Sequence, residues 1–157
     1  PYLQVVVKEI LRLRMVVPLV PRKAEADIEV NGYRIPKGTN VILNAWAINR
    51  DGEAWKDPDT FRPSRFMAGE GEAAGVDFKG GCFEFLPFVS GRRSCPGMAL
   101  GLYALELAVA QLTHGFTWAL PDGMKPTELD MGDIFGLTAS RSTRLYAVPT
   151  PRLTCPM

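Results

Sequence analysis

Cys95 stands in a short basic stretch, Gly-Arg-Arg-Ser-Cys-Pro-Gly over residues 91–97, whose composition could carry chemistry. Residues 98–113 follow it as an apolar run rich in Leu, Ala and Val, which predicts a helix. Pro96 suits a first helical position, because its missing N–H has no partner there, so the helix is expected to begin at Cys95. The unpaired amides and the positive dipole end of such a helix face the sulfur, which favours the thiolate form.

The residues around Cys95 suit a flat ligand that carries negative charge. Gly91 and Gly97 have no Cβ, so the backbone can lie against a flat group or turn with positive φ. Arg92 and Arg93 carry guanidinium groups, which bind carboxylates. A thiolate, a bare backbone and an adjacent arginine together fit an axial haem ligand with a clamp for the haem propionates.

Other chemistry at Cys95 fits the spacing less well. A zinc site needs several close ligands, and the remaining candidates, Cys82, Cys155 and His114, form no C-x-x-C pair. A phosphatase-type loop requires an arginine six residues after the cysteine, where Gly101 stands. A protease nucleophile requires a histidine base, and His114 lies at the far end of the predicted helix. A half-buried structural cysteine remains an alternative.

The pattern Phe88-x-x-Gly91-x-Arg93-x-Cys95-x-Gly97 resembles, position for position, the haem-binding loop of the cytochromes P-450, the haem-thiolate monooxygenases. The resemblance implies that Cys95 is the axial ligand of the haem iron and that Arg93 holds a propionate. It also implies that Phe88 packs beside the sulfur, excludes water and tunes the potential.

Two further motifs of this family precede the cysteine loop in the expected order. Glu9-x-x-Arg12 lies in the amphipathic pattern of residues 2–13, which predicts a helix, and Phe-Arg-Pro-Ser-Arg-Phe spans residues 61–66. The resemblance implies that Arg65 closes a buried ion network with Glu9 and Arg12, in which loss of one member strands a charge. On the residues alone, an exposed pair at i, i+3 is the alternative.

Two stretches are expected to line a substrate pocket, because in the family they reach the space above the haem. One is the proline-bounded extended segment 15–21, and the other is the tip of a last hairpin. The candidate pocket residues are Met15, Val16, Val17, Leu19, Val20, Phe135, Leu137 and Thr138. Plain core packing is the alternative for the aliphatic residues and for Phe135.

Three positions near these motifs are notable against the family pattern. Arg22 stands where the family has His or Arg on a haem propionate. Arg14-Met15-Val16 replaces the His-Pro-Pro that plant relatives commonly have. Val89 stands where relatives often have Gly, at a position that the motif leaves free, so this change is expected to be tolerated.

The pattern of elements predicts a mainly α protein with small β-sheets, the C-terminal, haem-side part of the cytochrome P-450 fold. Asn31-Gly32 is a strong hairpin signal, and Asn44 is a good helix cap. Besides the two helices already described, we expect a hairpin over 27–35, strands over 39–43 and 116–120, a short helix over 45–49, and a last hairpin formed by 133–139 and 144–148. The glycine-rich segment 68–81 is expected to be an exposed loop without a domain boundary.

Composition places the chain among globular proteins and excludes some functions. Apolar residues make up 46% and charged residues 22%, enough for a core. A net charge of +1 without a long basic run gives no electrostatic footprint for nucleic acid. Three scattered cysteines predict no disulfide framework and fit a reducing compartment, and no apolar run is long enough to span a bilayer. The chain opens inside a helical pattern without Met, so we expect residues 1–157 to be a fragment of one domain.

The resemblance implies a whole enzyme that uses haem b, O2 and electrons from NADPH through a cytochrome P-450 reductase. It would hydroxylate an apolar or aromatic small molecule at the cytosolic face of the endoplasmic reticulum, held there by an N-terminal anchor absent from this chain. Four stretches resemble more closely the plant ferulate and coniferaldehyde 5-hydroxylases of lignin biosynthesis. They are residues 44–51, 96–104, 120–126 and 135–139.

Two alternatives to a hydroxylase stay open at this point. The family's oxygen-activating helix is expected upstream of residue 1, so the chain could be a truncated product that binds haem without catalysis. Some haem-thiolate relatives rearrange hydroperoxides instead of activating oxygen. Their cysteine loop departs from the Gly-Arg-Arg-Ser-Cys-Pro-Gly form at residues 91–97.

Overall fold

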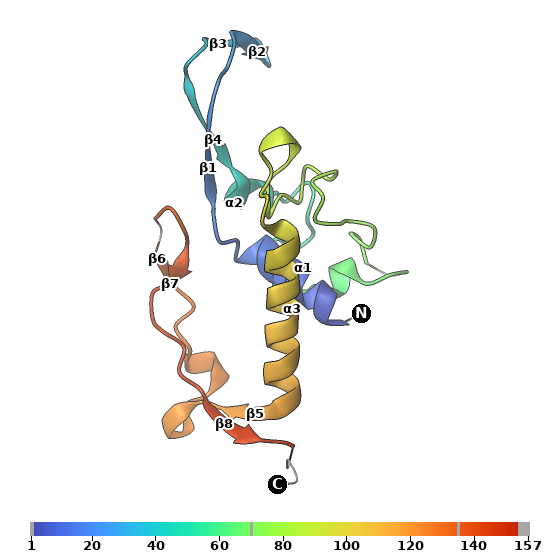
Figure 1. The fold of residues 1–157 in the computed structure, drawn as a ribbon, viewed down its shortest axis with the longest axis vertical. Coiled ribbons are helices and arrows are strands. Elements are labelled where there is room, and N and C mark those ends of the chain that lie inside the picture. The colour runs from blue at the N-terminus through green and yellow to red at the C-terminus, as the bar shows by residue number, and fades with distance from the viewer. Residues whose placement is uncertain (1, 70, 135, 154–157) are drawn as a thin grey trace.

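The computed structural model describes residues 2–69, 71–134 and 136–153. Two longer helices, α1 (Tyr2–Leu13) and α3 (Met98–Gly115), lie beside four antiparallel pairs of short strands (Figure 1). Long irregular segments and short 3₁₀ turns join these elements. The combination of helices with small antiparallel sheets was expected, but the described residues are not mainly α, since α-helix is confined to α1, α3 and one short helix, Ala45–Ile48.

Helix α1 is confirmed with the bounds that its periodicity predicts. Apolar residues recur at helical spacing, and Val7 and Leu11 are buried against the segments that follow. Glu9 and Arg12 are buried together with them. On a simple amphipathic helix these charged residues would face solvent. This helix therefore carries charge into the interior.

The hairpin of β2 (Ile28–Val30) and β3 (Tyr33–Ile35) is confirmed, and its turn has positive φ at Asn31 and Gly32, at 49° and 81°. It extends from a second pair, β1 (Leu19–Lys23) and β4 (Asn40–Asn44), at one end of the molecule in Figure 1.

Strand β1 was not predicted, because Pro21 lies inside it. Pro21 is opposite Ile42 in the pairing with β4. A two-stranded sheet has only edges, so this pair tolerates a residue without an N–H. The short helix α2 (Ala45–Ile48) follows β4, and Asn44 caps it by accepting a hydrogen bond from the Ala47 N–H at 3.0 Å.

Helix α3 ends at Gly115, and the predicted strand follows as β5 (Phe116–Ala119). The predicted partner arm of the last hairpin is wrong. Strand β6 (Asp133–Ile134) pairs with β7 (Ser140–Arg141), while β8 (Val148–Pro151) pairs with β5. The hairpin closes early because the Ser142 N–H donates to the Gly132 carbonyl at 2.9 Å, which leaves residues 144–147 to connect the two sheets.

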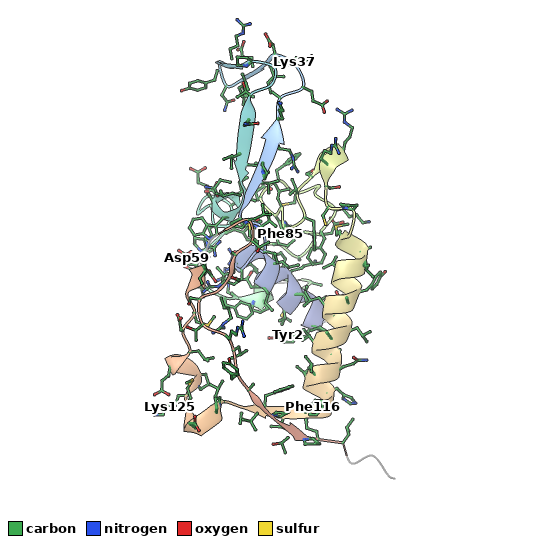
Figure 2. The ribbon with its side chains drawn as sticks, turned by 60° about the vertical axis from the view of Figure 1, so that its left-hand side comes forward. Tyr2, Lys37, Asp59, Phe85, Phe116 and Lys125 are labelled. Carbon is green, nitrogen blue, oxygen red and sulfur yellow. The ribbon has the colours of Figure 1, made fainter. Side chains whose placement is uncertain are left out.

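An aromatic cluster forms the centre of the core, and Figure 2 labels one of its members, Phe85. Trp55, Phe66 and Phe85 are buried, with ring centroids 5.3–6.2 Å apart. Phe78 packs on Phe85 from segment 68–81. That segment forms no helix or strand among its described residues, but it is not simply an exposed loop, because Ala73 is buried in the same cluster.

Helix α3 differs from α1 in that the structure buries none of its side chains. Leu100 and Tyr103 are 77% and 74% exposed, so much of its apolar surface is uncovered within the described residues. Within those residues, no helix combines the length and the apolar character needed to cross a membrane.

Candidate functional site

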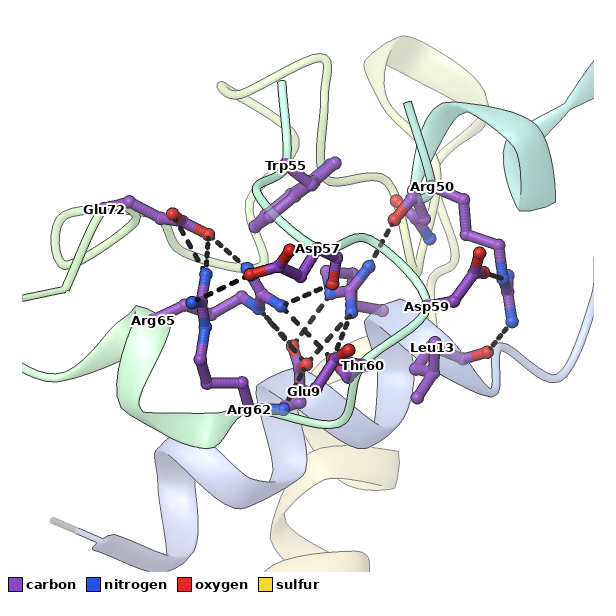
Figure 3. A network of polar contacts seen from close by, with 12 residues as sticks. Glu9, Leu13, Arg50, Trp55, Asp57, Asp59, Thr60, Arg62, Arg65 and Glu72 are labelled. Atoms are coloured by element: carbon purple, nitrogen blue, oxygen red, sulfur yellow. Dashed lines mark hydrogen bonds and ion pairs between the residues drawn. The ribbon is translucent and has the colours of Figure 1, made fainter. Parts of the chain in front are cut away.

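A buried ion network joins helix α1 to the 3₁₀ turn Pro63–Phe66 (Figure 3). Arg12 donates to Glu9 through Nε at 2.8 Å and through Nη2 at 3.0 Å. Arg65 donates to the same carboxylate through Nε, 3.2 Å from Oε1. The side chains of all three residues are 0% exposed. The structure thus brings together the three residues of the two family motifs, in a buried arrangement and not as a surface pair.

Local geometry explains why these side chains meet. Glu9 and Arg12 are one helical turn apart on α1, and Pro63 starts the turn that directs Arg65 inward. The Arg62 N–H, at the start of that turn, also donates to Glu9 Oε1 at 2.8 Å. A single carboxylate therefore orients a helix and a turn that are separated by some fifty residues of sequence.

Glu72 is a member of this network that sequence reasoning missed. Its carboxylate accepts a hydrogen bond from Arg65 Nη1 and lies 3.1 Å from Arg62 Nη2. The loop reaches it because Gly71 has no side chain, since a Cβ there would collide with the Arg65 carbonyl. No motif marks Glu72, because it stands in a segment without periodicity.

Further groups complete the solvation of the two buried guanidinium ions. Arg12 and Arg65 lie 5.2 and 5.8 Å from the centre of the Trp55 ring. Both also donate to the Thr60 carbonyl, at 3.4 and 3.2 Å. Nearby, Arg50 pairs with Asp59 at 3.5 Å and donates to the Leu13 carbonyl, and its burial lowers the pKa of Arg50.

The loop before α3 holds Cys95 by its backbone. A 3₁₀ turn over Gly91–Arg93 begins with φ of 78° at Gly91, and the Cys95 N–H donates to the Phe88 carbonyl at 3.0 Å. The prediction that the helix begins at Cys95 is wrong. Gly97 is the N-cap and Met98 the first helical residue, because Cys95 and Pro96 are held in the loop and turn instead. The sulfur is nevertheless near the helix start, 4.0 Å from where a Cβ on Gly97 would lie.

Val89, at a position where valine was expected to be tolerated, is accommodated with backbone strain. Its φ is 62°, in the left-handed region, which is unfavourable for a β-branched residue. Its side chain is half-buried and packs against the cluster formed by Met15, Val20 and Ala45. The lost backbone energy is partly offset by this packing.

Arg22 and Arg93 line the same cleft, about 850 Å³ in volume, beside the cysteine loop. Arg22, on β1, donates through Nη2 to the Arg93 carbonyl at 3.2 Å. Lys23 and Lys37 also line the cleft, together with one acidic residue, Glu25. The excess of cations suits carboxylates. Phe88 is half-buried, with its ring 6.0 Å from that of Phe78, while Arg92 and Cys95 are exposed.

The candidate pocket residues divide into two groups. Met15 and Val20 are buried in the core with Ala45, so for Val20 the structure supports the core alternative instead of a pocket wall. The remaining described candidates are accessible. They are Val16, Val17, Leu19, Leu137 and Thr138. Phe135 lies outside the described residues.

Two contacts hold the β6–β7 hairpin against the segment that follows α1. The Ala139 N–H donates to the Val16 carbonyl at 2.8 Å, and Arg14 forms an ion pair with Asp133 at 2.5 Å. Arg14, one of the three residues that depart from the plant pattern, therefore contacts the hairpin directly. The two predicted pocket segments are neighbours in space.

Asp130 closes the base of this hairpin. The hydroxyls of Ser142 and Thr143 each donate to its carboxylate at 2.6 Å, and the Gly132 N–H donates at 2.8 Å. These hydrogen bonds lower the pKa of Asp130 to about 2. Asp130 is therefore charged at and above the usual pKa range of a carboxyl group. Its hydrogen bonds weaken as the carboxylate is protonated, when the pH falls toward 2.

Metal chemistry at cysteine and histidine clusters is not supported by the described residues, which contain no group of three potential ligands. Cys82 donates to Glu84 at 3.0 Å, and burial raises the pKa of its thiol. Cys95 stands apart from it as an exposed free thiol.

Comparison with known proteins shows the family to which the chain belongs. The sequence profile of the family described as Cytochrome P450 matches residues 1–144. Cytochrome P450 84A1 of Arabidopsis thaliana is 59% identical over 154 residues, which are 98% of this chain and 29% of that protein. The chain belongs to the cytochrome P450 family. Cytochrome P450 CYP99A1 of Sorghum bicolor is 51% identical over 96% of this chain and 30% of its own length. This cytochrome P450 chain thus spans about 30% of the length of the curated relatives it matches.

Solved structures agree on the fold. A zebra fish cytochrome P450 with abiraterone aligns with a TM-score of 0.79 at 32% identity, over 97% of this chain and 34% of that one. The cyanobacterial CYP120A1 with bound retinoic acid aligns with a TM-score of 0.79 at 26% identity, over 96% and 32% of the two chains.

The residues present fit the haem that this family implies. The Cys95 side chain is exposed, and Gly91 and Gly97 on either side of it would meet open space or only the sulfur if they carried a Cβ. A flat group can therefore approach the loop, with the guanidinium groups of Arg22 and Arg93 on the adjoining cleft for its carboxylates.

The network predicts that Arg12→Ala is severely destabilising. Removing one buried partner leaves charge uncompensated, at a cost of about 3–5 kcal/mol. We expect aggregated or haem-poor full-length protein, measured by haem content and thermal melting. Arg34→Ala is the control, because Arg34 pairs with Asp27 on the surface and should melt like the parent. Normal haem content and melting in Arg12→Ala would contradict a buried network.

The strain at Val89 predicts an unusual order of stabilities. Val89→Ala and Val89→Gly both remove the packing, but only Gly adopts positive φ freely, so the Gly variant should be more stable by about 1–2 kcal/mol. Denaturant unfolding measures the difference. Val41, inside strand β4, is the control. There the Ala variant should have a free energy of unfolding about 0.5–1 kcal/mol higher than the Gly variant. The same order at both positions would show that Val89 is unstrained.

Proposed function

We propose that the whole protein is a haem-thiolate monooxygenase in which Cys95 is the protein ligand of the iron. The observation that carries the proposal is an exposed cysteine, fixed by its backbone N–H to Phe88, in a cytochrome P450 chain that places Arg22 and Arg93 on the adjoining cleft. Haem bound there supplies the reductive activation of O2.

Each residue of the loop has a separate role in this proposal. Cys95 donates electron density to the iron as a thiolate. Arg22 and Arg93 neutralise the haem carboxylates, and the hydrogen bond between them fixes strand β1 to the loop. Phe88, whose ring packs on Phe78, excludes water from the sulfur. Gly91 and Gly97 leave room for a flat ligand.

We further propose an apolar aromatic substrate, a phenylpropanoid such as ferulate or coniferaldehyde, hydroxylated at the 5 position. Two features support this class. Val16, Leu19 and Leu137 present aliphatic surface at the accessible pocket segments, and residues 44–51, 96–104 and 120–126 resemble the 5-hydroxylases.

Electrons are proposed to come from NADPH through a cytochrome P-450 reductase, at the cytosolic face of the endoplasmic reticulum. This part of the proposal rests on the family resemblance. It requires a full-length chain, of which these residues form about 30% by comparison with the curated relatives.

The ligand assignment predicts the spectrum of a cysteine variant. In the full-length haem-loaded protein, Cys95→Ala should abolish the thiolate-type Soret band of the ferrous carbonyl complex, because no sulfur would remain on the iron. Cys82→Ala is the matched control, since Cys82 bonds Glu84 away from the cleft. An unchanged spectrum in Cys95→Ala would overturn the proposed function.

The pocket assignment predicts a change in selectivity without a change in the haem. Leu137→Phe adds bulk at the hairpin tip, where Leu137 is 78% exposed, so the ratio of kcat/KM for coniferaldehyde and ferulate should change several-fold. The Soret spectrum should stay the same. Leu145→Phe is the control, at a groove lined by Leu112 and Trp118. If the parent protein hydroxylates neither compound, the proposed substrate class is wrong. If the ratio of kcat/KM is unchanged in Leu137→Phe, Leu137 does not line the pocket.

A further inference from the structure

Asn49 is a fully buried polar residue beside the ion network. It follows α2 as its C-cap residue and is 0% exposed, although asparagine is seldom fully buried. Its N–H donates to the Ala45 carbonyl at 3.1 Å, which closes the short helix. Neither the family motifs nor the proposed function assigns it a role.

Asn49 connects three segments that are distant in the sequence. Its main-chain carbonyl accepts a hydrogen bond from Arg12 Nη1 at 2.8 Å. Its side-chain Oδ1 accepts one from the Leu86 N–H at 3.2 Å, and its Nδ2 donates to the Met15 sulfur at 3.6 Å. One residue thus contacts the ion network, the loop that leads to the cysteine and the segment that leads to the pocket.

Backbone hydrogen bonds connect the segment that begins at Leu86 with Cys95. The Leu86 carbonyl accepts from the Val89 N–H at 3.1 Å, and the Phe88 carbonyl accepts from the Cys95 N–H at 3.0 Å. Leu86 is only 4% exposed, so water cannot easily replace an acceptor lost from its N–H. Within the part of the chain that the structure describes, every buried side-chain nitrogen and oxygen has a partner, so the amide belongs to a fully satisfied arrangement.

We infer that Asn49 is a positioning residue for the Cys95 loop. Its Oδ1 fixes Leu86 and with it the Leu86–Val89 turn, from whose Phe88 carbonyl the cysteine N–H is held. The inference rests on the proposal that Cys95 binds haem iron. It assigns the effect to the side chain alone, because the bond from Arg12 goes to the main chain and survives substitution.

Side-chain chemistry makes this role specific. Alanine at position 49 leaves the buried Leu86 N–H without an acceptor, a loss that corresponds to about a 5- to 150-fold change in an equilibrium constant. Aspartate keeps an oxygen at the same place, so it retains the bond to Leu86, whereas its second oxygen replaces the amide group that donates to the Met15 sulfur. Because the site is fully buried, we expect this aspartate to be protonated and so to add no buried charge. The two variants therefore separate the loop contact from the contact with Met15.

The experiment compares Asn49→Ala, Asn49→Asp and Asn44→Ala in the full-length haem-loaded protein. Asn44 is the matched control, because it caps the other end of the same helix and its side chain accepts a hydrogen bond from the Ala47 N–H and not from the cysteine loop. Two quantities are measured: the share of bound haem that gives the thiolate-type ferrous carbonyl spectrum, and amide hydrogen exchange over residues 82–95.

We expect Asn49→Ala to exchange faster over residues 82–95, by about 5- to 150-fold at Leu86, and to lose part of its thiolate-type spectrum. Asn49→Asp should resemble the parent more closely than Asn49→Ala does, both in amide hydrogen exchange and in the ferrous carbonyl spectrum. Asn44→Ala should match the parent in both measurements. The inference is overturned if Asn49→Ala matches the parent, or if Asn49→Asp and Asn44→Ala lose the spectrum as fully as Asn49→Ala. A parent without any thiolate-type spectrum refutes the proposed function instead, so the two failures are distinguishable.

Discussion

Burial of the Glu9 carboxylate is the constraint on which the arrangement of this chain depends. A fully buried carboxylate is tolerated only when cations and hydrogen-bond donors surround it. Here Arg12, Arg65 and the Arg62 N–H supply them, and Trp55 covers the two guanidinium ions. Because these groups come from α1, the 61–66 turn and the segments between them, satisfying one charge fixes the relative positions of all of them.

The position of the cysteine loop depends on the aromatic cluster that packs beside the ion network. Phe85 is fully buried against Trp55 and Phe66, and a few residues later the backbone turns through positive φ at Val89 and Gly91 before presenting Cys95 outward. A ligand site held by backbone hydrogen bonds on a rigid core can keep its sulfur in one place while the cleft beside it stays open. Strain at Val89 and exposure at Cys95 are compatible with a loop arranged for a ligand.

Sequence patterns predicted the parts of the structure that are local. The periodicity of α1 and the Asn31-Gly32 turn follow from spacing, while the ion network of Glu9, Arg12 and Arg65 was expected from the resemblance to the family motifs. Two predictions failed because the local pattern does not show the competing contacts. Strand β8 pairs with β5, and α3 starts at Met98 because the Cys95 N–H is bound to the Phe88 carbonyl. The roles of Glu72 and Asn49 had no local signal, because a carboxylate in an aperiodic loop and an amide at a helix end acquire partners only when the chain folds.

The central claim is that this core presents Cys95 as the sulfur ligand of a haem iron. X-ray absorption at the iron edge of the full-length haem-loaded protein tests it most directly, because it reports the atoms bound to the metal. The account predicts one sulfur atom in the iron coordination sphere together with the porphyrin nitrogens. A coordination sphere of nitrogen and oxygen alone would contradict it.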